Sequence, residues 1–217
     1  MTSQPILVVE PRLLTLEGGE GAGKSTVLAA LRDALQADGL EVVCTREPGG
    51  TPLAERIREL LLDPSHEAAL PETELLLMFA SRAQHVRERI VPALRRGAWV
   101  ISDRFTDSSF AYQGAGRGLD PGFIAELERQ VVGIEPGLTL LLDLGIAHGR
   151  ERTRGRDLLP DRIERERDEF FERVRSGFLA RAAEHPRRFR VLNASPPAEV
   201  VAAAAVAALN AYRQVLP

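Results

Sequence analysis

The octapeptide Gly-Gly-Glu-Gly-Ala-Gly-Lys-Ser at residues 18–25 constrains the fold more than any other part of the chain. It matches the pattern G-x-x-x-x-G-K-[ST], follows an apolar run at residues 13–17 and precedes a helical stretch at residues 24–37. A strand, a glycine-rich loop and a helix in this order form a phosphate-binding loop, in which backbone N–H groups and the helix N-terminus surround phosphate oxygens. Lys24 is expected to reach the β- and γ-phosphates, and the Ser25 hydroxyl is expected to bind Mg²⁺.

Glu20 lies inside this loop, and its carboxylate has two interpretations. Beside a triphosphate it is unfavourable unless it meets a hydroxyl or the metal ion, whereas as a solvated loop residue it needs no partner. The residues expected at the triphosphate are Gly18, Gly19, Glu20, Gly21, Ala22, Gly23, Lys24, Ser25 and Thr26. The motif alone does not say what the nucleotide is used for.

Strand-like and helix-like stretches alternate along the chain. Strands are predicted at residues 13–17, 40–45, 98–102, 138–143 and 188–192. Helices are predicted at residues 24–37, 51–62, 71–94, 120–133, 161–184 and 197–215. Strands separated by helices need crossover connections, so the pattern predicts an α/β fold of the P-loop NTPase type, with a five-stranded parallel sheet flanked by helices. The 217 residues suit one domain, and residues 1–10 are expected to form a loose N-terminal extension.

The composition excludes several classes of function. A formal net charge of −3 gives no electrostatic case for a nucleic-acid partner. The one cysteine, Cys44, permits no intramolecular disulfide, and the sequence holds no zinc-type Cys/His cluster, which fits a reducing cytoplasm. The apolar run at residues 6–9 is too short for a signal peptide or a membrane span. We therefore expect a cytoplasmic protein without a nucleic-acid or membrane partner.

Two polar segments follow the second and third predicted strands, at the end of the sheet where ligands bind. Residues 45–51 read Thr-Arg-Glu-Pro-Gly-Gly-Thr, which can bring Arg46 to a ligand or can be an ordinary strand-to-helix turn. A cis peptide bond is predicted at Glu47–Pro48, because tight turns beside ligands favour it. Asp103 can hold Mg²⁺ through water and Arg104 can clamp a phosphate, or the two can form a structural ion pair.

Residues 108–114, Ser-Ser-Phe-Ala-Tyr-Gln-Gly, offer hydroxyls, an amide and an aromatic ring that can read a base or a sugar, or cap a helix. Arg82 lies in an otherwise apolar helical stretch, and a buried arginine needs a partner such as a nucleobase carbonyl or a neighbouring glutamate. Residues 75–79 are apolar around the whole helix, so we expect burial on both sides, against the core and against a second subunit.

A cluster of basic side chains follows the fourth predicted strand. Its members, all within seven residues, are Arg150, Arg152, Arg154 and Arg156. A run of charged residues commonly lies on a solvent-exposed surface. At the ligand end of the sheet, however, a mobile basic lid would exclude water and stabilise charge during phosphoryl transfer. We expect this lid at about residues 145–160, and since the phosphate loop has no arginine, a lid arginine can supply that charge.

Five segments occur in the order seen in bacterial thymidylate kinases, which the chain resembles from about residue 12 to about residue 210. They are residues 18–26, 45–51, 81–84, 103–118 and 161–164. The motifs T-R-E-P-G-G-T and D-R-F-x-D-S-S-x-A-Y-Q-G-x-G-R-G are far more specific than the phosphate loop. The resemblance implies a homodimeric nucleoside monophosphate kinase that uses Mg²⁺ to transfer the γ-phosphoryl group of ATP to dTMP, giving dTDP and ADP in dTTP synthesis.

On the acceptor side, the resemblance implies that Arg46 and Arg104 hold the phosphate of dTMP. Arg82 and Ser109 would read the thymine edge, and Tyr112 would lie under the deoxyribose and exclude a 2′-hydroxyl. The further residues expected at dTMP are Glu20, Pro48, Met78, Phe79, Ser108 and Gln113.

On the donor side, the resemblance implies that Arg152 packs on adenine, with Asn193 and Ser195 at the adenine edge. Arg154 and Arg156 resemble the lid arginines of the bacterial subtype. Between the donor and acceptor sides, Glu20 would face the sugar 3′-hydroxyl of the acceptor and the metal region. The residues expected in catalysis are Lys24, Asp103, Arg104, Arg154 and Arg156, and those expected at the metal are Glu20, Ser25 and Asp103.

The chain departs from the family at the residue expected to stack on thymine. The family usually places a phenylalanine four residues before the arginine that matches Arg82, and here Met78 has that position, with Phe79 next to it. One residue around a helix is about 100°, so both side chains cannot face the base alike. Either Met78 makes a softer contact, or a local shift of the helix brings Phe79 to the base.

Two other functions are compatible with the phosphate loop. One is a kinase for another nucleotide or deoxynucleoside, and the other is a P-loop ATPase switch that acts on a protein partner. The acceptor motifs at Arg46, Arg104 and residues 112–113 argue against the switch.

We predict that Lys24→Ala abolishes phosphoryl transfer and leaves the fold intact, because Lys24 is expected to contact the β- and γ-phosphates. Turnover and thermal melting would be measured together. Activity within about tenfold of the wild type, a loss of only ~1.4 kcal/mol in transition-state stabilisation, would contradict the assignment of the phosphate loop.

Overall fold

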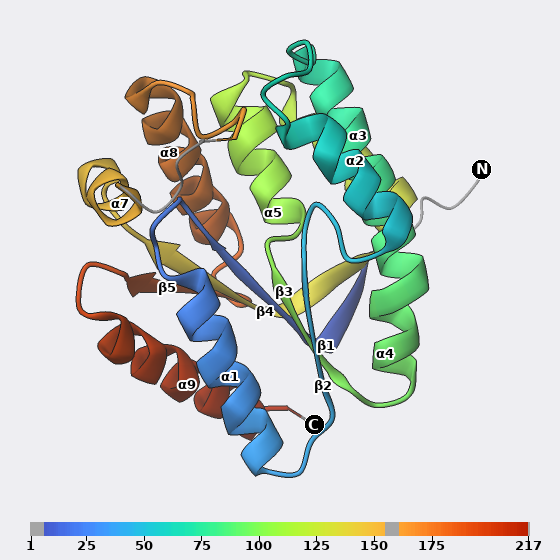
Figure 1. The fold of residues 1–217 in the computed structure, drawn as a ribbon. Coiled ribbons are helices and arrows are strands. Elements are labelled where there is room, and N and C mark those ends of the chain that lie inside the picture. The colour runs from blue at the N-terminus through green and yellow to red at the C-terminus, as the bar shows by residue number, and fades with distance from the viewer. Residues whose placement is uncertain (1–6, 155–160, 217) are drawn as a thin grey trace.

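A five-stranded parallel sheet, in the order β2-β3-β1-β4-β5, forms the centre of the molecule (Figure 1). The computed structural model describes residues 7–154 and 161–216. The strands are β1 (Val8–Gly18), β2 (Val42–Arg46), β3 (Trp99–Asp103), β4 (Ile134–Asp143) and β5 (Phe189–Asn193). The expected fold class is therefore confirmed, and β1 occupies the middle of the sheet, where its carboxyl end has a neighbouring strand on each side.

Helices connect successive strands and cover both faces. They are α1 (Lys24–Ala37), α2 (Pro52–Leu62), α3 (Pro71–His85), α4 (Val91–Arg95), α5 (Thr106–Ser109), α6 (Pro121–Leu127), α7 (Ile146–Thr153), α8 (Asp168–Glu184) and α9 (Ala198–Gln214). Three π-helical turns, η1 (Val86–Ile90), η2 (Phe110–Gly116) and η3 (Glu128–Val132), continue α3, α5 and α6. Among the described residues, no helix is long and apolar enough to cross a membrane.

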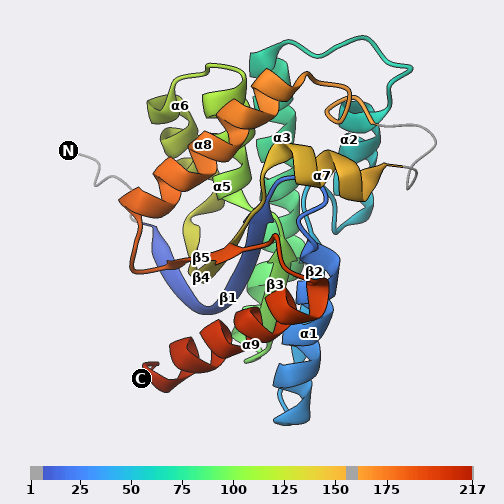
Figure 2. The same ribbon diagram turned by 90° about the vertical axis from the view of Figure 1, so that its left-hand side faces the viewer.

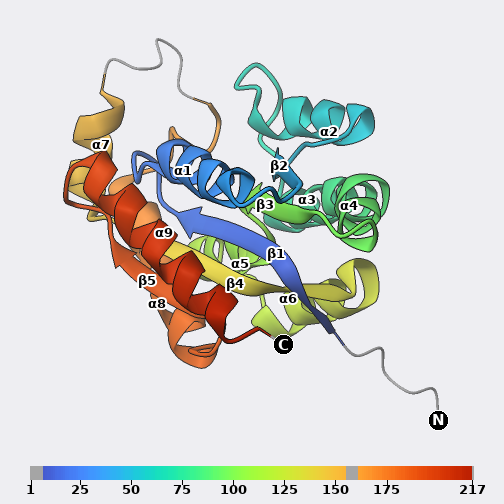
Figure 3. The same ribbon diagram turned by 90° about the horizontal axis from the view of Figure 1, so that it is seen from below.

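The sheet lies between helices on both of its faces (Figure 3). Each face carries its own hydrophobic core. On one face, Leu31 of α1 and Leu209 of α9 pack with the β1 side chain Leu14. On the other face, Leu13 packs with Phe79 of α3 in a second core. Adjacent β1 residues enter different cores because successive side chains of a strand point to opposite faces.

A third cluster joins η2 to α8, where Tyr112 packs edge-on against Phe178 at a centroid distance of 6.0 Å. α2 and α7 lie at the same end of the molecule (Figure 2), beyond the carboxyl ends of the strands, on opposite sides of it (Figure 1). This is the end where an open parallel sheet binds ligands.

Two predicted boundaries are wrong. Residues 8–10, expected in a loose extension, belong to β1, because Val8 and Val9 pair with the β4 residues Ile134 and Glu135. Glu10, Pro11 and Arg12 separate the apolar run at residues 6–9 from the one at residues 13–17, so the sequence does not read as one strand, and both valines are more than half exposed.

The helix expected at residues 161–184 begins only at Asp168. Asp161 closes a separate turn before it, since its Oδ1 accepts hydrogen bonds from the backbone N–H groups of Ile163 and Glu164. An aspartate favours such a turn because its side chain bonds to nearby backbone. Charged residues on both sides of this turn make the sequence read as one continuous helix.

Candidate active site

The phosphate loop joins the carboxyl end of β1 to the N-terminus of α1, as the motif predicts. Gly21 and Gly23 have φ angles of +73° and +88°, a region that residues with a Cβ rarely adopt. The Lys24 ammonium donates hydrogen bonds to the carbonyl oxygens of Gly18 and Gly19, at 3.3 and 3.0 Å. Its nitrogen is therefore held over the loop, where a bound phosphate would meet it.

α7 packs directly on the phosphate loop. A Cβ atom at Gly149 would lie 2.7 Å from the carbonyl oxygen of Glu20, and a Cβ atom at Gly21 would lie 2.6 Å from that of Gly149. Backbone meets backbone here, so the two segments fit only because both positions are glycine.

Arg152 ties α7 to the β5–α9 loop. Its guanidinium donates to the carbonyl oxygens of Ala194 and Ser195, at 2.8 and 2.9 Å. Asn193 in turn accepts the Ser195 N–H at 2.9 Å. The three residues expected around adenine therefore lie together beside the phosphate loop.

Arg154 is exposed at the C-terminal end of α7, and Arg156 lies outside the described residues.

A cavity opens between α2, α3 and η2 beside the loop, with an empty volume of about 580 Å³, and we call it the α2–α3 cavity. The predicted site residues that line it are Glu20, Pro48, Met78, Arg82, Arg104, Ser108, Ser109, Tyr112 and Gln113. Two predicted residues that the structure describes lie outside this lining: Arg46 forms an ion pair with Glu55, and Phe79 is 2% exposed in the core.

Arg104 stands where the cavity meets the phosphate loop. Its φ angle of +71° is unusual for a residue with a Cβ and costs of order 1–3 kcal/mol. Its guanidinium donates to Glu20 at 2.8 Å, to the Tyr112 hydroxyl at 3.1 Å and to the Ser108 hydroxyl at 3.2 Å. The strained backbone aims this cation between the loop and the cavity.

Arg82 forms the opposite wall and is 2% exposed. Its Nε donates to Glu47 at 2.6 Å, one terminal nitrogen donates to Ser109 at 3.0 Å, and the other donates to the Phe105 carbonyl oxygen at 3.0 Å. The neighbouring glutamate considered as its partner is thus Glu47. The guanidinium has five N–H groups, and these bonds use three of them, which leaves donors for a ligand.

Met78 and Phe79 take different positions around α3. Met78 lines the cavity, whereas the Phe79 ring lies in the core, 4.8 Å from the guanidinium carbon of Arg82. The predicted cis peptide bond at Glu47–Pro48 is present, and Pro48 lines the cavity.

Sequence reasoning missed several residues of this site. Arg58 lines the cavity and donates to the Pro48 carbonyl oxygen at 3.0 Å. It follows Ala54 by four residues on α2, so helical periodicity could have placed it on the inward side. Leu62, Asp161, Ile163 and Glu164 also line the cavity.

Glu17, at the end of β1, is the buried residue that sequence reasoning left without a role. Its two carboxylate oxygens accept the Phe105 N–H at 2.8 Å and the Ser108 hydroxyl at 2.6 Å. Burial and the Asp107 carboxylate raise its pKa to about 8, although Arg104, Ser108 and Phe105 oppose the rise. Glu17 thereby connects the start of the phosphate loop to the segment that carries Arg104.

A divalent cation fits the residues beside the loop. Asp103 has a buried Oδ1 that accepts no hydrogen bond from the described residues. Such an orphaned carboxylate oxygen is costly unless water or an ion meets it. Ser25, in the first turn of α1, and Glu20 offer the hard oxygen atoms that Mg²⁺ prefers.

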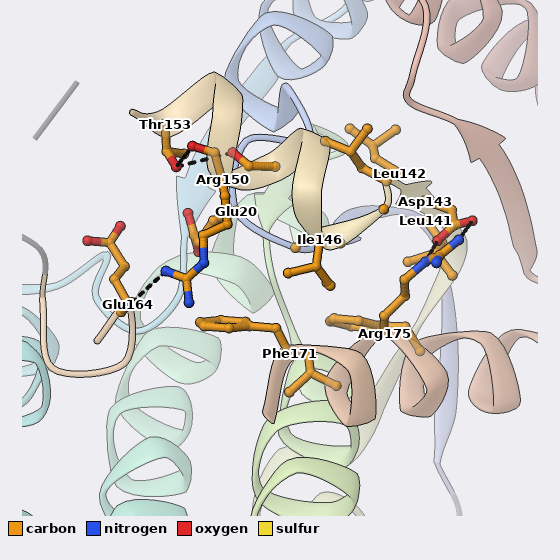
Figure 4. A pocket seen from close by; sticks show the side chains of 17 residues that line it. Glu20, Leu141, Leu142, Asp143, Ile146, Arg150, Thr153, Glu164, Phe171 and Arg175 are labelled. Carbon is orange, nitrogen blue, oxygen red and sulfur yellow. Dashed lines mark hydrogen bonds and ion pairs between the residues drawn. The ribbon is translucent and has the colours of Figure 1, made fainter. Parts of the chain in front are cut away.

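A second cavity lies between α7, α8 and β4, and we call it the α7–α8 cavity (Figure 4). Its middle is apolar, with Ile146 and Phe171 on opposite sides. The Arg175 guanidinium pairs with both oxygens of Asp143, and Arg150 pairs with an aspartate of α8.

A phosphate loop facing a cavity with arginines on two walls defines a P-loop phosphotransferase that acts on a small phosphorylated acceptor. Residues 16–205 match the family model of thymidylate kinase. The chain belongs to the thymidylate kinase family. As a member, it phosphorylates dTMP to dTDP and uses ATP.

Curated and solved relatives agree with this assignment. The chain is 58% identical over 201 residues to a thymidylate kinase of Chromohalobacter salexigens, which covers 92% of this chain and 95% of the relative. It is 54% identical over 199 residues to one of Alkalilimnicola ehrlichii, covering 91% and 92%. The crystal structure of thymidylate kinase from Ehrlichia chaffeensis is similar with a TM-score of 0.76 at 31% identity, covering 93% of this chain and 99% of that one.

The raised pKa of Glu17 predicts a pH-dependent stability. Between its ordinary value of 4.5 and about 8, the folded chain binds a proton that the unfolded chain has released. The free energy of unfolding should therefore fall as pH rises through this window, by up to ~1.4 kcal/mol per pH unit from this group. Glu17→Gln cannot titrate, so it should flatten that slope.

Urea unfolding between about pH 5 and pH 8 measures the slope. The exposed Glu199→Gln is the matched control and should keep the wild-type slope. A Glu17→Gln slope equal to that of the wild type would show that Glu17 does not titrate in this range.

Proposed function

We propose that this chain transfers the γ-phosphoryl group of ATP to dTMP by in-line displacement, as a Mg²⁺-dependent cytoplasmic homodimer in dTTP synthesis. One observation carries the proposal: the α2–α3 cavity adjoins the phosphate loop and has Arg104 at the loop end and Arg82 at the far wall. A nucleoside monophosphate has an anionic end and a hydrogen-bonding base, and the two arginines suit these two ends.

The donor nucleotide would lie on the phosphate loop, residues 18–26. Lys24 would meet the β- and γ-phosphates, and Arg152, Asn193 and Ser195 would surround the adenine. The packing of Arg152 against the β5–α9 loop supports this assignment.

Ser25, Asp103 and Glu20 would hold Mg²⁺, which when bound neutralises phosphate charge. The orphaned Oδ1 of Asp103 supports that role. Little covalent chemistry is asked of the chain, so catalysis consists of positioning the substrates and stabilising charge.

The acceptor would place its phosphate at Arg104 and its thymine at Arg82 and Ser109. Its sugar would lie between Tyr112 and Glu20, and both residues contact Arg104. Met78 is the candidate for contact with the face of the base, because it lines the cavity. Ser108, Gln113, Pro48 and Arg58 complete the proposed surroundings of the nucleotide.

For four predicted residues the structure gives less support to the proposed role. Arg46 would need to break its ion pair with Glu55 before it could bind the acceptor phosphate. Phe79 would act indirectly, as support under Arg82. Arg154 and Arg156, in the proposed lid at about residues 145–160, would supply positive charge during transfer.

A coupled ADP-release assay tests the reaction. We expect ADP release that depends on dTMP and on Mg²⁺, and far less with other nucleoside monophosphates. Release that does not respond to dTMP would instead support the ATPase switch, and a preference for another nucleotide would support a different kinase.

We predict that Arg82→Ala weakens the binding of dTMP by roughly 1–3 kcal/mol, because the base then loses its hydrogen-bond partner in a dry pocket. It should also narrow the preference for dTMP over dCMP, because a site built on hydrogen bonds rejects poor mimics best. Tyr112→Ala should open the 2′ position and favour ribonucleotides, while Tyr112→Phe should have a small effect. The measurement is kcat/KM for dTMP, dUMP, dCMP and UMP. An equal loss for all four in Arg82→Ala would make Arg82 structural.

We predict a homodimer through α3. In the single chain, one side of α3 packs in the core, while Leu76 is 51% exposed and Ala80, one turn further on, is exposed too. A charge at Leu76 should therefore separate the subunits, because it would be buried without a partner.

Sedimentation of Leu76→Arg at micromolar concentration tests this prediction. Val200→Arg is the matched control, since Val200 is 52% exposed on α9. A monomeric wild type, or a dimer that survives Leu76→Arg, would contradict the assignment of the interface.

A further inference from the structure

His85, the last residue of α3, is fully buried and lies outside the lining of the α2–α3 cavity. Its ring nevertheless reaches the segment at residues 45–51, which forms one wall of that cavity through Pro48. Its Nε2 is 2.6 Å from the Thr45 hydroxyl, and its Nδ1 is 2.9 Å from an oxygen of Glu47. Both ring nitrogens therefore hold this one segment.

The ring also fills the space left by a glycine. Gly50 has a φ angle of +89°, and a Cβ atom there would lie 2.5 Å from two atoms of the His85 ring. The turn is therefore fitted around the imidazole at three points, namely Thr45, Glu47 and Gly50. A buried imidazole needs a partner at each nitrogen, and here both partners belong to this one turn.

Glu47 links this contact to the cavity wall. One of its oxygens meets His85, and the other accepts the Nε–H of Arg82 at 2.6 Å. Burial opposes ionisation of Glu47, but Arg82 and His85 outweigh it and lower the pKa of its carboxyl. An ionised, buried carboxylate with one partner on each oxygen has little freedom to rotate. The hydrogen bond from His85 to one oxygen of Glu47 therefore fixes the position of the other oxygen, which accepts the hydrogen bond from Arg82.

We propose that His85 is a positioning residue for base recognition: it holds Glu47, and Glu47 sets the orientation in which Arg82 presents its remaining N–H groups to the acceptor base. The inference rests on the proposed role of Arg82 as the reader of thymine. A ring with its proton on Nδ1 donates to Glu47 and accepts the Thr45 hydroxyl proton at Nε2, which satisfies every group in the chain of contacts.

Two substitutions separate the two ring contacts. His85→Asn keeps an amide near the position of Nδ1, so it retains the bond to Glu47 and loses the bond to Thr45. His85→Gln reaches instead toward the position of Nε2, so it retains Thr45 and loses Glu47. Both variants replace the ring by an amide and leave similar empty space, so a purely structural histidine predicts similar effects for the two.

The measurement is kcat and KM for dTMP and dCMP, with thermal melting of each variant. We expect His85→Gln to lower kcat/KM for dTMP by about tenfold or more, chiefly through KM, and to reduce the preference for dTMP over dCMP. His85→Asn should stay within about threefold of the wild type in that preference. Equal losses for both nucleotides in His85→Gln, or equal losses of preference in the two variants, would overturn the inference.

Arg82→Lys, measured in parallel, separates this inference from the function on which it rests. If Arg82→Lys leaves the preference unchanged, Arg82 is not the reader and the role of His85 falls with it. If Arg82→Lys lowers the preference and His85→Gln does not, only the role of His85 is wrong. A wild-type chain without dTMP-dependent ADP release would refute the proposed reaction itself.

A measurement on the wild-type chain does not depend on the variants folding. Of the four histidines, His85 alone is buried, so its ring N–H exchanges slowly and can be distinguished in a chain with ¹⁵N-labelled histidine. We expect dTMP to shift the ring nitrogen resonances of His85 more than dCMP does. Resonances that stay unchanged at saturating dTMP would overturn the inference.

Discussion

The contact between Glu17 and the start of α5 is the interaction on which the geometry of this site depends. β1 and β3 are neighbours in the sheet, so their carboxyl ends deliver the phosphate loop and Arg104 to the same place. Parallel pairing alone sets the distance between the strands, but it does not set the conformation of the segments that leave their carboxyl ends. Glu17 supplies that restraint, because one carboxylate holds both the Phe105 N–H and the Ser108 hydroxyl.

The restraint explains how a strained residue can persist at the centre of the site. Arg104 has a positive φ angle, and its N–H donates to the Leu16 carbonyl oxygen of β1 while its own carbonyl oxygen accepts the Ser102 hydroxyl. These bonds, together with those of Glu17 to the next residues, offset a cost of order 1–3 kcal/mol. This conformation directs the Arg104 side chain toward the phosphate loop, where its guanidinium donates hydrogen bonds to Glu20 and to the Tyr112 hydroxyl.

The fold could be predicted well from the sequence, because strands and the turns between them appear in it as hydrophobic runs and glycine-containing turns. All five strands and the phosphate loop lie where the pattern indicated, within a few residues except at β1. The failures have a common cause in polar local contacts. The turn at Asp161 interrupts a stretch that reads as one helix, and residues 106–116 form helical turns although serine and glycine favour other structures there.

The residues of the site likewise divide into those that the sequence reveals and those that only the structure reveals. The residues proposed to contact a ligand lie in motifs, so Lys24, Arg82 and Arg104 could be named from the sequence. Glu17 and His85 could not be given a role, because each acts through a contact between segments far apart in the chain. A buried carboxylate or imidazole has no periodicity of its own, and its partners are known only when the strands are in register.

Two buried glutamates restrain the two arginines proposed for recognition and transfer. Glu17 restrains the segment that carries Arg104, at the phosphate end, while Glu47 restrains Arg82, at the far wall of the α2–α3 cavity. Each arginine is thus fixed by a different strand end, β1 in one case and β2 in the other. The two supports meet at Phe105, because its N–H donates to Glu17 and its carbonyl oxygen accepts an N–H of Arg82. A change at Glu17 should therefore also reach the far wall of the cavity, and this shared residue couples the choice of base to the rate of transfer.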